Sequence, residues 1–313
     1  MITTVTMNAS VDKRYSVEML EPGTVIRVRK CRNTAGGKGL NVTRTLSLLG
    51  AEVIAVGIVA GRNGDFIEGE LTALGIDHDF SRARGESRCC INVVEDSGGA
   101  GARQTEFLEP GPEPDFRSLD DFWARFSRAA SRSRVVAASG SLPAGAPSGF
   151  YRSLAKAARE AGAKVIVDSS GPSLLEALEG RPDLVKPNLD EAGAVLGTGL
   201  QTEMDAAGAA EELIRRGAGA AAVSMGARGV VAAGPEGVFH AAPPQVEPKT
   251  VVGCGDAMVA GFALGFDAGW GFARALKFAA ALSAASAMCE ETGGFRKADL
   301  EAVHPQVTVK SLK

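Results

Sequence analysis

The chain has 313 residues, a net charge of −3, 45% hydrophobic residues and 23% charged residues. This length suits one large α/β domain, and the composition is ordinary for a globular protein. The negative net charge argues against nucleic acid or an anionic membrane as the main partner. No apolar run is long enough to span a membrane and no signal peptide is predicted, so we expect a cytoplasmic protein.

Cysteine and histidine usage excludes two classes of site. The five cysteines show no C-x-x-C spacing and include an adjacent pair, Cys89 and Cys90. They predict neither a disulfide framework nor a zinc site. None of the three histidines stands beside a cluster of Cys or Asp, so we expect neither histidine-centred catalysis nor a histidine-bound metal.

The chain begins with a predicted strand, Ile2–Asn8, followed by a turn that contains Asp12. If this strand belongs to a parallel sheet, ligands bind at its carboxyl end, which places Asp12 at the edge of a site. The alternative is a solvated turn residue. Two alternating runs come next, Arg14–Met19 and Val25–Arg32, and with a turn at residues 21–23 they predict an antiparallel pair.

A glycine-rich run, G-G-K-G at positions 36–39, opens a predicted helix, Leu40–Leu49. It is not a P-loop, which needs Ser or Thr after Gly-Lys, and it lacks the Gly or Ala that a dinucleotide fingerprint needs at position 42. We interpret it as a loop from which Lys38 and Asn41 reach toward a polyhydroxylated, negatively charged small molecule. The alternative is a glycine-rich loop with a solvated lysine.

A second hairpin is predicted from Arg88–Glu95 and Arg103–Glu109, joined by a turn at residues 97–101. Because side chains alternate along a strand, Arg88 and Cys90 share one of its faces. Two hairpins inserted into an α/β chain can pair into one small sheet. That sheet has an uncovered apolar face, so we expect it to close over a site or to pair with another subunit.

The rest of the chain alternates between strands and helices, which predicts a mostly parallel sheet covered by helices on both faces. The predicted strands are Val53–Val59, Asp77–Phe80, Arg134–Ala138, Lys164–Asp168, Leu184–Lys186, Ala220–Ser224, Gly229–Ala233 and Gly237–Ala241. The predicted helices are Asp65–Leu74, Phe116–Ala130, Ser148–Ala161, Leu174–Leu178, Asn188–Leu196, Glu203–Arg216, Asp256–Phe266 and Phe272–Met288. From His304 onward we expect a tail.

The stretch Lys249–Phe262 is the main candidate for chemistry. Gly253 and Gly255 permit a tight turn whose N–H groups face an anion at the start of a helix. Asp256 would repel a phosphate that is merely bound there. It fits a site where the carboxylate takes a proton from a hydroxyl while the N–H groups hold the phosphoryl group that this hydroxyl attacks. An ordinary helix N-cap is the alternative.

Six stretches together are more specific than any one glycine loop: Thr34–Thr43, Ser87–Ile91 with Gln104–Pro112, Ser139–Pro143, Lys186–Glu191, Ser224–Gly229 and Gly253–Asp256. In these the sequence resembles the ribokinase/phosphofructokinase-B family of sugar kinases, and within it the branch of 1-phosphofructokinase and tagatose-6-phosphate kinase. The similarity runs along nearly the whole chain. It implies a ribokinase-like three-layer α/β/α domain over residues 1–313, with a mostly parallel central sheet and a small β-sheet lid formed by insertions at 13–33 and 86–110.

The resemblance also implies roles for particular residues. Asp256 would be the general base on the accepting hydroxyl, with the backbone of Gly253, Cys254 and Gly255 around the γ-phosphoryl group of ATP. The implied ATP-binding residues are Lys186, Asn188, Ser224, Met225, Gly226, Ala227, Arg228, Gly229 and Gly255. Glu191, the last residue of an N-x-x-E motif, would act on Mg²⁺ through water. The implied substrate-binding residues are Asp12, Gly37, Lys38, Asn41, Arg88 and Ser139.

A substrate that already carries a phosphate needs a cationic cluster apart from the triphosphate site, and Lys38, Arg88 and Arg27 could supply it. We therefore expect an ATP-dependent kinase of a ketohexose monophosphate, fructose 1-phosphate or tagatose 6-phosphate, that makes a bisphosphate. The alternatives are a kinase of an unphosphorylated sugar or nucleoside, a non-catalytic sugar-phosphate sensor, and a nicotinamide-dependent oxidoreductase. Because the lid of relatives also dimerises, we expect a homodimer through the lid.

Three positions depart from the family's pattern. Cys254 stands where Ala or Ser is usual, but the mechanism uses only its N–H group. Thr250 stands where many relatives carry an Asp that helps to bind a monovalent cation, which argues against activation by K⁺. The pair Gly293-Gly294 lacks the Asn usual in this branch, so the resemblance assigns no contacts to adenine.

Overall fold

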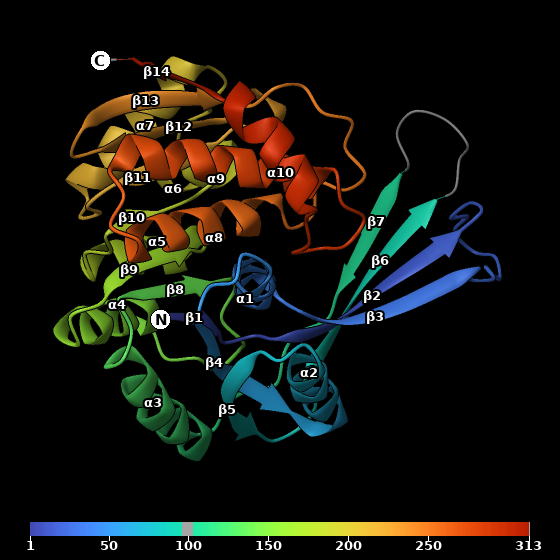
Figure 1. Ribbon diagram of the computed structural model, residues 1–313. Helices are drawn as coiled ribbons and strands as arrows, with labels where there is room; N and C mark the ends of the chain where they lie inside the picture. Colours follow the sequence, from blue (N-terminus) through green and yellow to red (C-terminus); the bar gives the residue numbers. More distant parts are fainter. Residues whose placement is uncertain (96–102, 313) are drawn as a thin grey trace.

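The computed structural model describes residues 1–95 and 103–312, which build a large sheet, a small sheet and two layers of helices (Figure 1). The turn predicted at residues 97–101 lies outside the described residues. The strands of the large sheet are β1 (Ile2–Thr6), β4 (Val53–Ala60), β5 (Asp77–Ala83), β8 (Val135–Ser139), β9 (Lys164–Asp168), β10 (Leu184–Val185), β11 (Ala221–Ser224), β12 (Val230–Gly234), β13 (Gly237–Ala242) and β14 (Thr308–Ser311).

These strands follow the order β14-β13-β12-β11-β10-β9-β8-β1-β4-β5. Neighbours from β11 to β5 pair in parallel, and those from β11 to β14 pair antiparallel. Parallel strands need crossover connections, and the helices between them supply these crossovers. The mostly parallel sheet expected from the sequence is confirmed.

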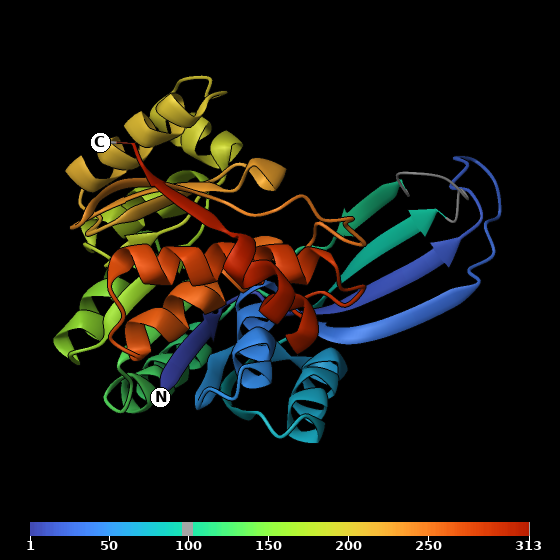
Figure 2. The same cartoon turned by 45° about the horizontal axis from the view of Figure 1, so that its top comes forward.

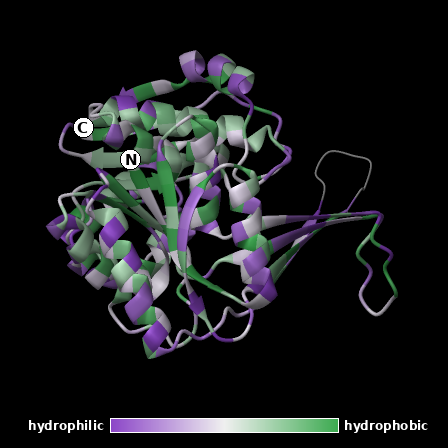
Figure 3. Cartoon of the chain, turned by 60° about the horizontal axis from the view of Figure 1, so that its bottom comes forward, coloured by the Kyte–Doolittle hydropathy of each residue, from purple (hydrophilic) through white to green (hydrophobic). Residues whose placement is uncertain are grey.

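Helices cover the large sheet on both faces, which confirms the three-layer architecture. One face packs against α3 (Phe116–Ala130), α4 (Phe150–Glu160), α5 (Gly171–Glu179), α6 (Leu189–Leu196) and α7 (Glu203–Arg215). The other packs against α1 (Lys38–Leu48), α2 (Gly61–Ala73), α8 (Cys254–Asp267), α9 (Phe272–Ala287) and α10 (Lys297–Val303). Because both faces are covered, most residues of the central strands are apolar (Figure 3). Strand β1 is an exception, since it also buries Thr3, Thr4 and Thr6. No helix of the described chain is long and apolar enough to cross a membrane.

The small sheet projects from the body beside the carboxyl ends of the central strands (Figure 2). It consists of β2 (Ser10–Val17), β3 (Lys30–Gly36), β6 (Arg88–Glu95) and β7 (Gln104–Leu108), in the order β3-β2-β6-β7. Strands β2 and β6 run parallel, and each has its antiparallel hairpin partner on the outside. The two predicted hairpins therefore do pair into one small sheet.

Three predictions about segments were wrong. Asp12 was predicted in a turn, but it lies within β2, where it pairs with Thr34 of β3. The strand predicted at Val25–Arg32 instead occupies Lys30–Gly36, because β2 pairs with this polar segment, from Ser10 opposite Gly36 to Ser16 opposite Lys30. The apolar residues that suggested the earlier strand lie in the connection, where Val25 is 88% exposed. The predicted tail after His304 contains an edge strand, Thr308–Ser311, which pairs with β13.

Candidate active site

A cleft of about 1110 Å³ lies between the large sheet and the small sheet. It is lined by the residues predicted from the sequence, with two exceptions described below, Arg27 and Arg228. They are Asp12, Gly37, Lys38, Asn41, Arg88, Ser139, Lys186, Asn188, Glu191, Ser224, Met225, Gly226, Ala227, Gly229, Gly253, Cys254, Gly255 and Asp256. The structure thus gathers residues that are up to 244 positions apart, from Asp12 to Asp256, into one cavity.

The position of the cleft follows from the parallel sheet. Ser139, Asp168 and Ser224 are the last residues of β8, β9 and β11, and Lys186 comes directly after β10. The carboxyl ends of parallel strands meet at one edge of a sheet, where open α/β folds bind their ligands. Asp168 joins the site at this edge although the sequence analysis did not single it out.

The turn before α8 has the backbone that its glycines suggested. Gly253 is the N-cap of α8 and has φ 87°, a left-handed conformation that favours glycine. A Cβ at this position would also lie 2.8 Å from Thr292 Cγ2. Asp256 is in the first turn of the helix, and no side chain caps this helix through a hydrogen bond. The interpretation of Asp256 as an N-cap is therefore wrong.

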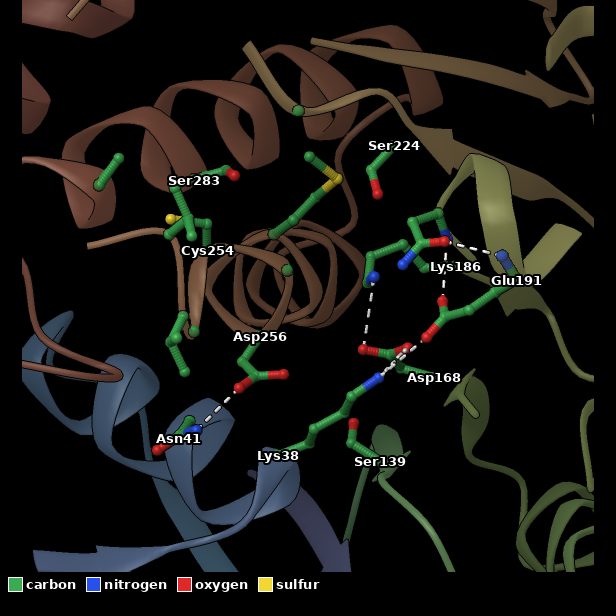
Figure 4. A pocket seen from close by; sticks show the side chains of 18 of the residues that line it. Lys38, Asn41, Ser139, Asp168, Lys186, Glu191, Ser224, Cys254, Asp256 and Ser283 are labelled. Carbon is green, nitrogen blue, oxygen red and sulfur yellow. Dashed lines mark hydrogen bonds and ion pairs between the residues drawn. The ribbon is translucent and has the colours of Figure 1, made fainter. Parts of the chain in front are cut away.

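Asp256 instead points into the cleft, where Asn41 Nδ2 donates a hydrogen bond of 2.8 Å to its Oδ2 (Figure 4). The carboxyl group is buried, and this burial raises its pKa to about 7, with the like charge of Asp168 as the second cause. Lys38 and Lys186 oppose the rise. A carboxylate that titrates near neutral pH at a helix N-terminus can accept a proton from a bound hydroxyl.

Asp168 is the centre of a charge cluster between α1 and β10 (Figure 4). Its side chain is fully buried, with Oδ1 3.4 Å from Lys38 Nζ and Oδ2 3.4 Å from Lys186 Nζ. Lys38 Nζ also lies 3.5 Å from Glu191 Oε1, and Asp168 is the largest cause of the raised pKa of Lys38. The sequence carried a signal for Asp168, since it ends a predicted parallel strand, which was the argument used for Asp12.

Lys38 and Arg88 line the same cleft but have different partners. Lys38 lies among the carboxylates of Asp168 and Glu191, whereas Arg88 Nε donates to the carbonyl oxygen of Asn8 at 3.1 Å. Arg27 does not line the cleft. Of the three expected cations, Lys38 and Arg88 therefore reach the cleft and Arg27 does not, and two buried or half-buried carboxylates pair with the Lys38 ammonium.

Asp12 lies beside Arg88 on the small sheet. Its carboxylate accepts a 2.6 Å hydrogen bond from Ser10 Oγ. Burial raises the pKa of Asp12, while this hydrogen bond and the nearby charge of Arg88 act in the opposite direction. The end of the cleft nearest the small sheet thus presents two acids, Asp12 and Glu106, and one guanidinium, that of Arg88.

The N-x-x-E motif forms a capping box at the start of α6. Asn188 Oδ1 accepts from the Glu191 N–H at 2.8 Å, and Glu191 Oε2 accepts from the Asn188 N–H at 2.9 Å. This reciprocal pair explains the spacing of the motif by itself. It leaves Glu191 Oε1 facing Lys38 in the cleft.

No group of three or more Cys, His, Asp or Glu in the described chain could hold a metal ion alone. Mg²⁺ is usually bound by one or two carboxylates together with substrate phosphates. Glu191 offers one carboxylate, and the buried Asp168 Oδ2 makes no hydrogen bond among the described residues, although it is ion-paired with Lys186 Nζ at 3.4 Å. These residues fit an ion that arrives with a phosphorylated ligand.

The far end of the cleft begins at β11 and the short 3₁₀ helix Gly226–Arg228. Arg228 is the second exception to the predicted lining, because its Nη1 donates to the carbonyl oxygen of Gln201 at 2.5 Å. Beyond it the cleft runs along α9 over largely apolar residues. They are Val246, Val251, Ala280, Ser283, Ala284 and Ala287. The sequence left this end unassigned, because small residues on a buried helix look the same whether they face a core or a ligand.

Several buried polar atoms in the cleft have no hydrogen-bond partner among the described residues. They are Thr6 Oγ1, Asn8 Oδ1, Asn41 Oδ1, Ser139 Oγ and Asp168 Oδ2. Buried polar atoms are nearly always hydrogen-bonded in folded proteins, by the chain itself, by water or by a ligand. Their concentration here suits a ligand rich in hydroxyl groups.

The fold is ribokinase-like. The structure of Arabidopsis thaliana ribokinase complexed with ribose and ATP is 18% identical, with 96% of this chain and 97% of that chain covered and a TM-score of 0.77. The family model described as pfkB family carbohydrate kinase matches residues 5–298. The chain belongs to the pfkB family of carbohydrate kinases.

Two further solved structures show the similarity in more detail. Phosphofructokinase-2 from Escherichia coli, solved in complex with potassium, is 27% identical, with 97% of this chain and 98% of that chain covered and a TM-score of 0.90. A protein from Thermotoga maritima described as a possible 1-phosphofructokinase is 29% identical, with 100% of this chain and 99% of that chain covered and a TM-score of 0.90.

Proposed function

We propose that this carbohydrate kinase transfers the γ-phosphoryl group of ATP to a hydroxyl group of a ketohexose monophosphate, fructose 1-phosphate or tagatose 6-phosphate. The observation that carries the proposal is the position of Asp256. A buried carboxylate with a pKa of about 7 comes directly after the turn Gly253–Gly255. This turn forms the start of α8, where the backbone N–H groups are free to bind an anion in the cleft. A proton acceptor and an anion-binding turn are thereby adjacent, as phosphoryl transfer to a hydroxyl requires.

In the proposed reaction, Asp256 takes the proton of the acceptor hydroxyl as its oxygen forms a bond to the γ-phosphorus. The bond between that phosphorus and the bridging oxygen breaks, and ADP leaves with the electron pair. The N–H groups of the Gly253–Gly255 turn stabilise charge on the phosphoryl oxygens. Glu191 and Asp168 would hold Mg²⁺ together with the ATP phosphates, where the ion neutralises charge.

The two substrates bind in different halves of the cleft. We place the triphosphate beside Lys186, Ser224 and Gly229, and the purine ring along the apolar surface of α9, because both are continuous with the Gly253–Gly255 turn. We place the acceptor between Asp12, Arg88 and Asn41. The unpartnered polar atoms on this side supply donors and acceptors for its hydroxyl groups.

Arg88 is the residue we assign to the phosphate that the acceptor already carries. We expect Arg88→Ala to raise the KM for the phosphorylated sugar about 10- to 100-fold, since charge-assisted hydrogen bonds contribute about 1.5–3 kcal/mol. The KM for ATP should stay unchanged, and Arg88→Lys should recover only part of the affinity because lysine lacks the planar fork. Steady-state kinetics measure this, and a raised KM for ATP alone would place Arg88 at the wrong end.

One observation favours a second candidate, a kinase of an unphosphorylated sugar. Lys38 is held by Asp168 and Glu191 and so is not free to pair with a sugar phosphate. An ADP-release assay with Mg-ATP against fructose 1-phosphate, tagatose 6-phosphate, fructose 6-phosphate, fructose, ribose and adenosine separates the two. Turnover of a phosphorylated ketohexose with little turnover of neutral sugars is expected, and turnover of neutral compounds alone would refute the proposed substrate.

We further propose that two copies associate through the small sheet. Its outer strand and the connection between β2 and β3 expose large apolar side chains, with Val25 88%, Leu108 65% and Met19 59% exposed. Such residues are typical of a protein interface. Sedimentation equilibrium should give a mass of about two chains, and Val25→Asp should shift it toward one. A monomeric wild-type protein would contradict this proposal.

A further inference from the structure

Arg44 is a buried arginine in α1, behind the wall of the cleft. It is 9% exposed, and its guanidinium contacts three separate segments. Nη2 donates to the carbonyl oxygen of Ala35 at 2.9 Å and lies 3.1 Å from Glu70 Oε1, while Nη1 donates to the carbonyl oxygen of Thr292 at 3.0 Å. A buried guanidinium whose donors are divided among three segments fixes those segments relative to one another.

On the acceptor side, Arg44 and Glu70 together hold the main chain of Ala35. Glu70 Oε2 accepts the Ala35 N–H at 2.5 Å, and Arg44 donates to its carbonyl. The next residue, Gly36, lies directly under Asp12, because a Cβ on Gly36 would be 2.0 Å from Asp12 Cγ. Because the main chain of Ala35 is fixed, the adjacent Gly36, against which the Asp12 carboxylate packs, is fixed as well.

On the phosphoryl side, Arg44 holds the loop that packs against the glycine turn. Thr292 is the residue that a Cβ on Gly253 would contact at 2.8 Å, and Gly293 N would lie 3.0 Å from the same atom. Thr45, the neighbour of Arg44, donates from Oγ1 to the carbonyl oxygen of Gly293 at 2.9 Å. The same helix thus fixes this loop at two consecutive carbonyls.

We propose that Arg44 is a positioning residue that holds the acceptor-binding strand end at Asp12 and the phosphoryl-binding turn at Gly253 in one fixed arrangement. The inference rests on the roles proposed above for these two residues. Because both ends depend on one side chain, a ligand that orders one end lowers the cost of ordering the other. Arg44 then contributes to the cooperativity between acceptor and nucleotide as well as to the alignment of the reacting groups.

The test compares Arg44→Lys and Glu70→Gln with a matched control, Arg125→Lys. Arg125 on α3 also pairs with two carboxylates, Asp79 and Asp121, but it does not line the cleft. Lysine at position 44 keeps the charge but loses the fork, and Glu70→Gln keeps the size but loses one acceptor. For each variant, we would measure Tm, kcat, both KM values, and the Kd of a non-hydrolysable ATP analogue with and without the acceptor.

We expect Arg44→Lys and Glu70→Gln to lower kcat at least about 10-fold and to raise the KM for the acceptor, as misalignment of reacting groups does. The acceptor should tighten binding of the ATP analogue in the wild-type protein, and this effect should fall toward none in both variants. Arg125→Lys should lower Tm and leave the kinetics and the coupling unchanged.

Two results would overturn the inference. One is an Arg44→Lys protein that loses Tm as the control does but keeps wild-type kinetics and coupling, because Arg44 would then be structural only. The other is a wild-type protein in which acceptor and ATP analogue bind independently. If the wild-type enzyme phosphorylates a neutral sugar instead, the proposed substrate fails, and the same test runs with that sugar.

Discussion

We expect Asp256→Asn to bind ATP and the acceptor with nearly unchanged affinity but to lose about 10²–10⁴-fold in kcat, the usual contribution of one general base. The asparagine amide cannot take a proton from the acceptor hydroxyl. Its side-chain oxygen can still accept the hydrogen bond that Asn41 donates to Asp256 in the native protein. The geometry of the cleft is therefore preserved, and the loss falls on the chemical step.

The same substitution should stabilise the folded protein above neutral pH. Burial raises the pKa of Asp256 from 3.8 to about 7, so the folded state favours the protonated carboxyl. The wild-type protein therefore loses part of its stability as the pH rises from 3.8, the pKa of Asp256 in the unfolded state, to about 7, its pKa in the folded state. A difference of about 3 pKa units corresponds to about 4 kcal/mol. Asparagine is neutral at every pH and avoids this cost.

Calorimetry at pH 4 and pH 8 with activity assays tests both statements. Tm of Asp256→Asn should exceed that of the wild type at pH 8 and match it near pH 4. Wild-type kcat/KM should rise with pH and level off above about 7, as the base becomes ionised. Asp120→Asn, an exposed acid on α3, serves as the control. Near-wild-type turnover in Asp256→Asn would contradict the assignment of the base.

The sequence predicted those parts of the site that depend on local chemistry. Gly253 and Asp256 were predicted because a glycine turn at a helix start can hold an anion, although this stretch alone left an ordinary N-cap as the alternative for Asp256. The large sheet was predicted because buried parallel strands are apolar on both faces. Asn188 and Glu191 were assigned through the resemblance to the family's N-x-x-E motif, and the capping box that also accounts for their spacing became visible only in the structure.

What the sequence could not give depends on pairing between distant segments. The strand Lys30–Gly36 is polar and forms because β2 lies beside it. Lys38 was expected to meet a sugar phosphate, and the carboxylates that hold it come from the ends of β9 and α6. Arg228 was predicted to bind ATP together with its neighbours in the sequence, but its side chain points away from the cleft and donates to the carbonyl oxygen of Gln201. No local pattern specifies which of two nearby partners a charged side chain takes.

Asp168→Ala should cost about 3–5 kcal/mol of stability, because it removes one partner of a buried ion pair and leaves the other uncompensated. The side chain of Lys186 is 4% exposed, and Asp168 Oδ2 is 3.4 Å from its Nζ. The loss of the ion pair with Lys38 costs less, since the Lys38 side chain is 40% exposed and remains ion-paired with Glu191. Urea denaturation measures the loss, and a destabilisation below about 1 kcal/mol would show that water already screens the pair.

A double variant distinguishes this cause from simple loss of packing. Asp168→Ala with Lys186→Met removes both charges, so it should be more stable than Asp168→Ala alone, because no buried ammonium is left unpaired. Additive losses would mean that the two charges do not interact. The pH profile gives a second readout. Asp168 raises the pKa of Asp256, so any activity retained by Asp168→Ala should appear at lower pH than in the wild type. An unshifted profile would contradict the electrostatic link between the two carboxylates.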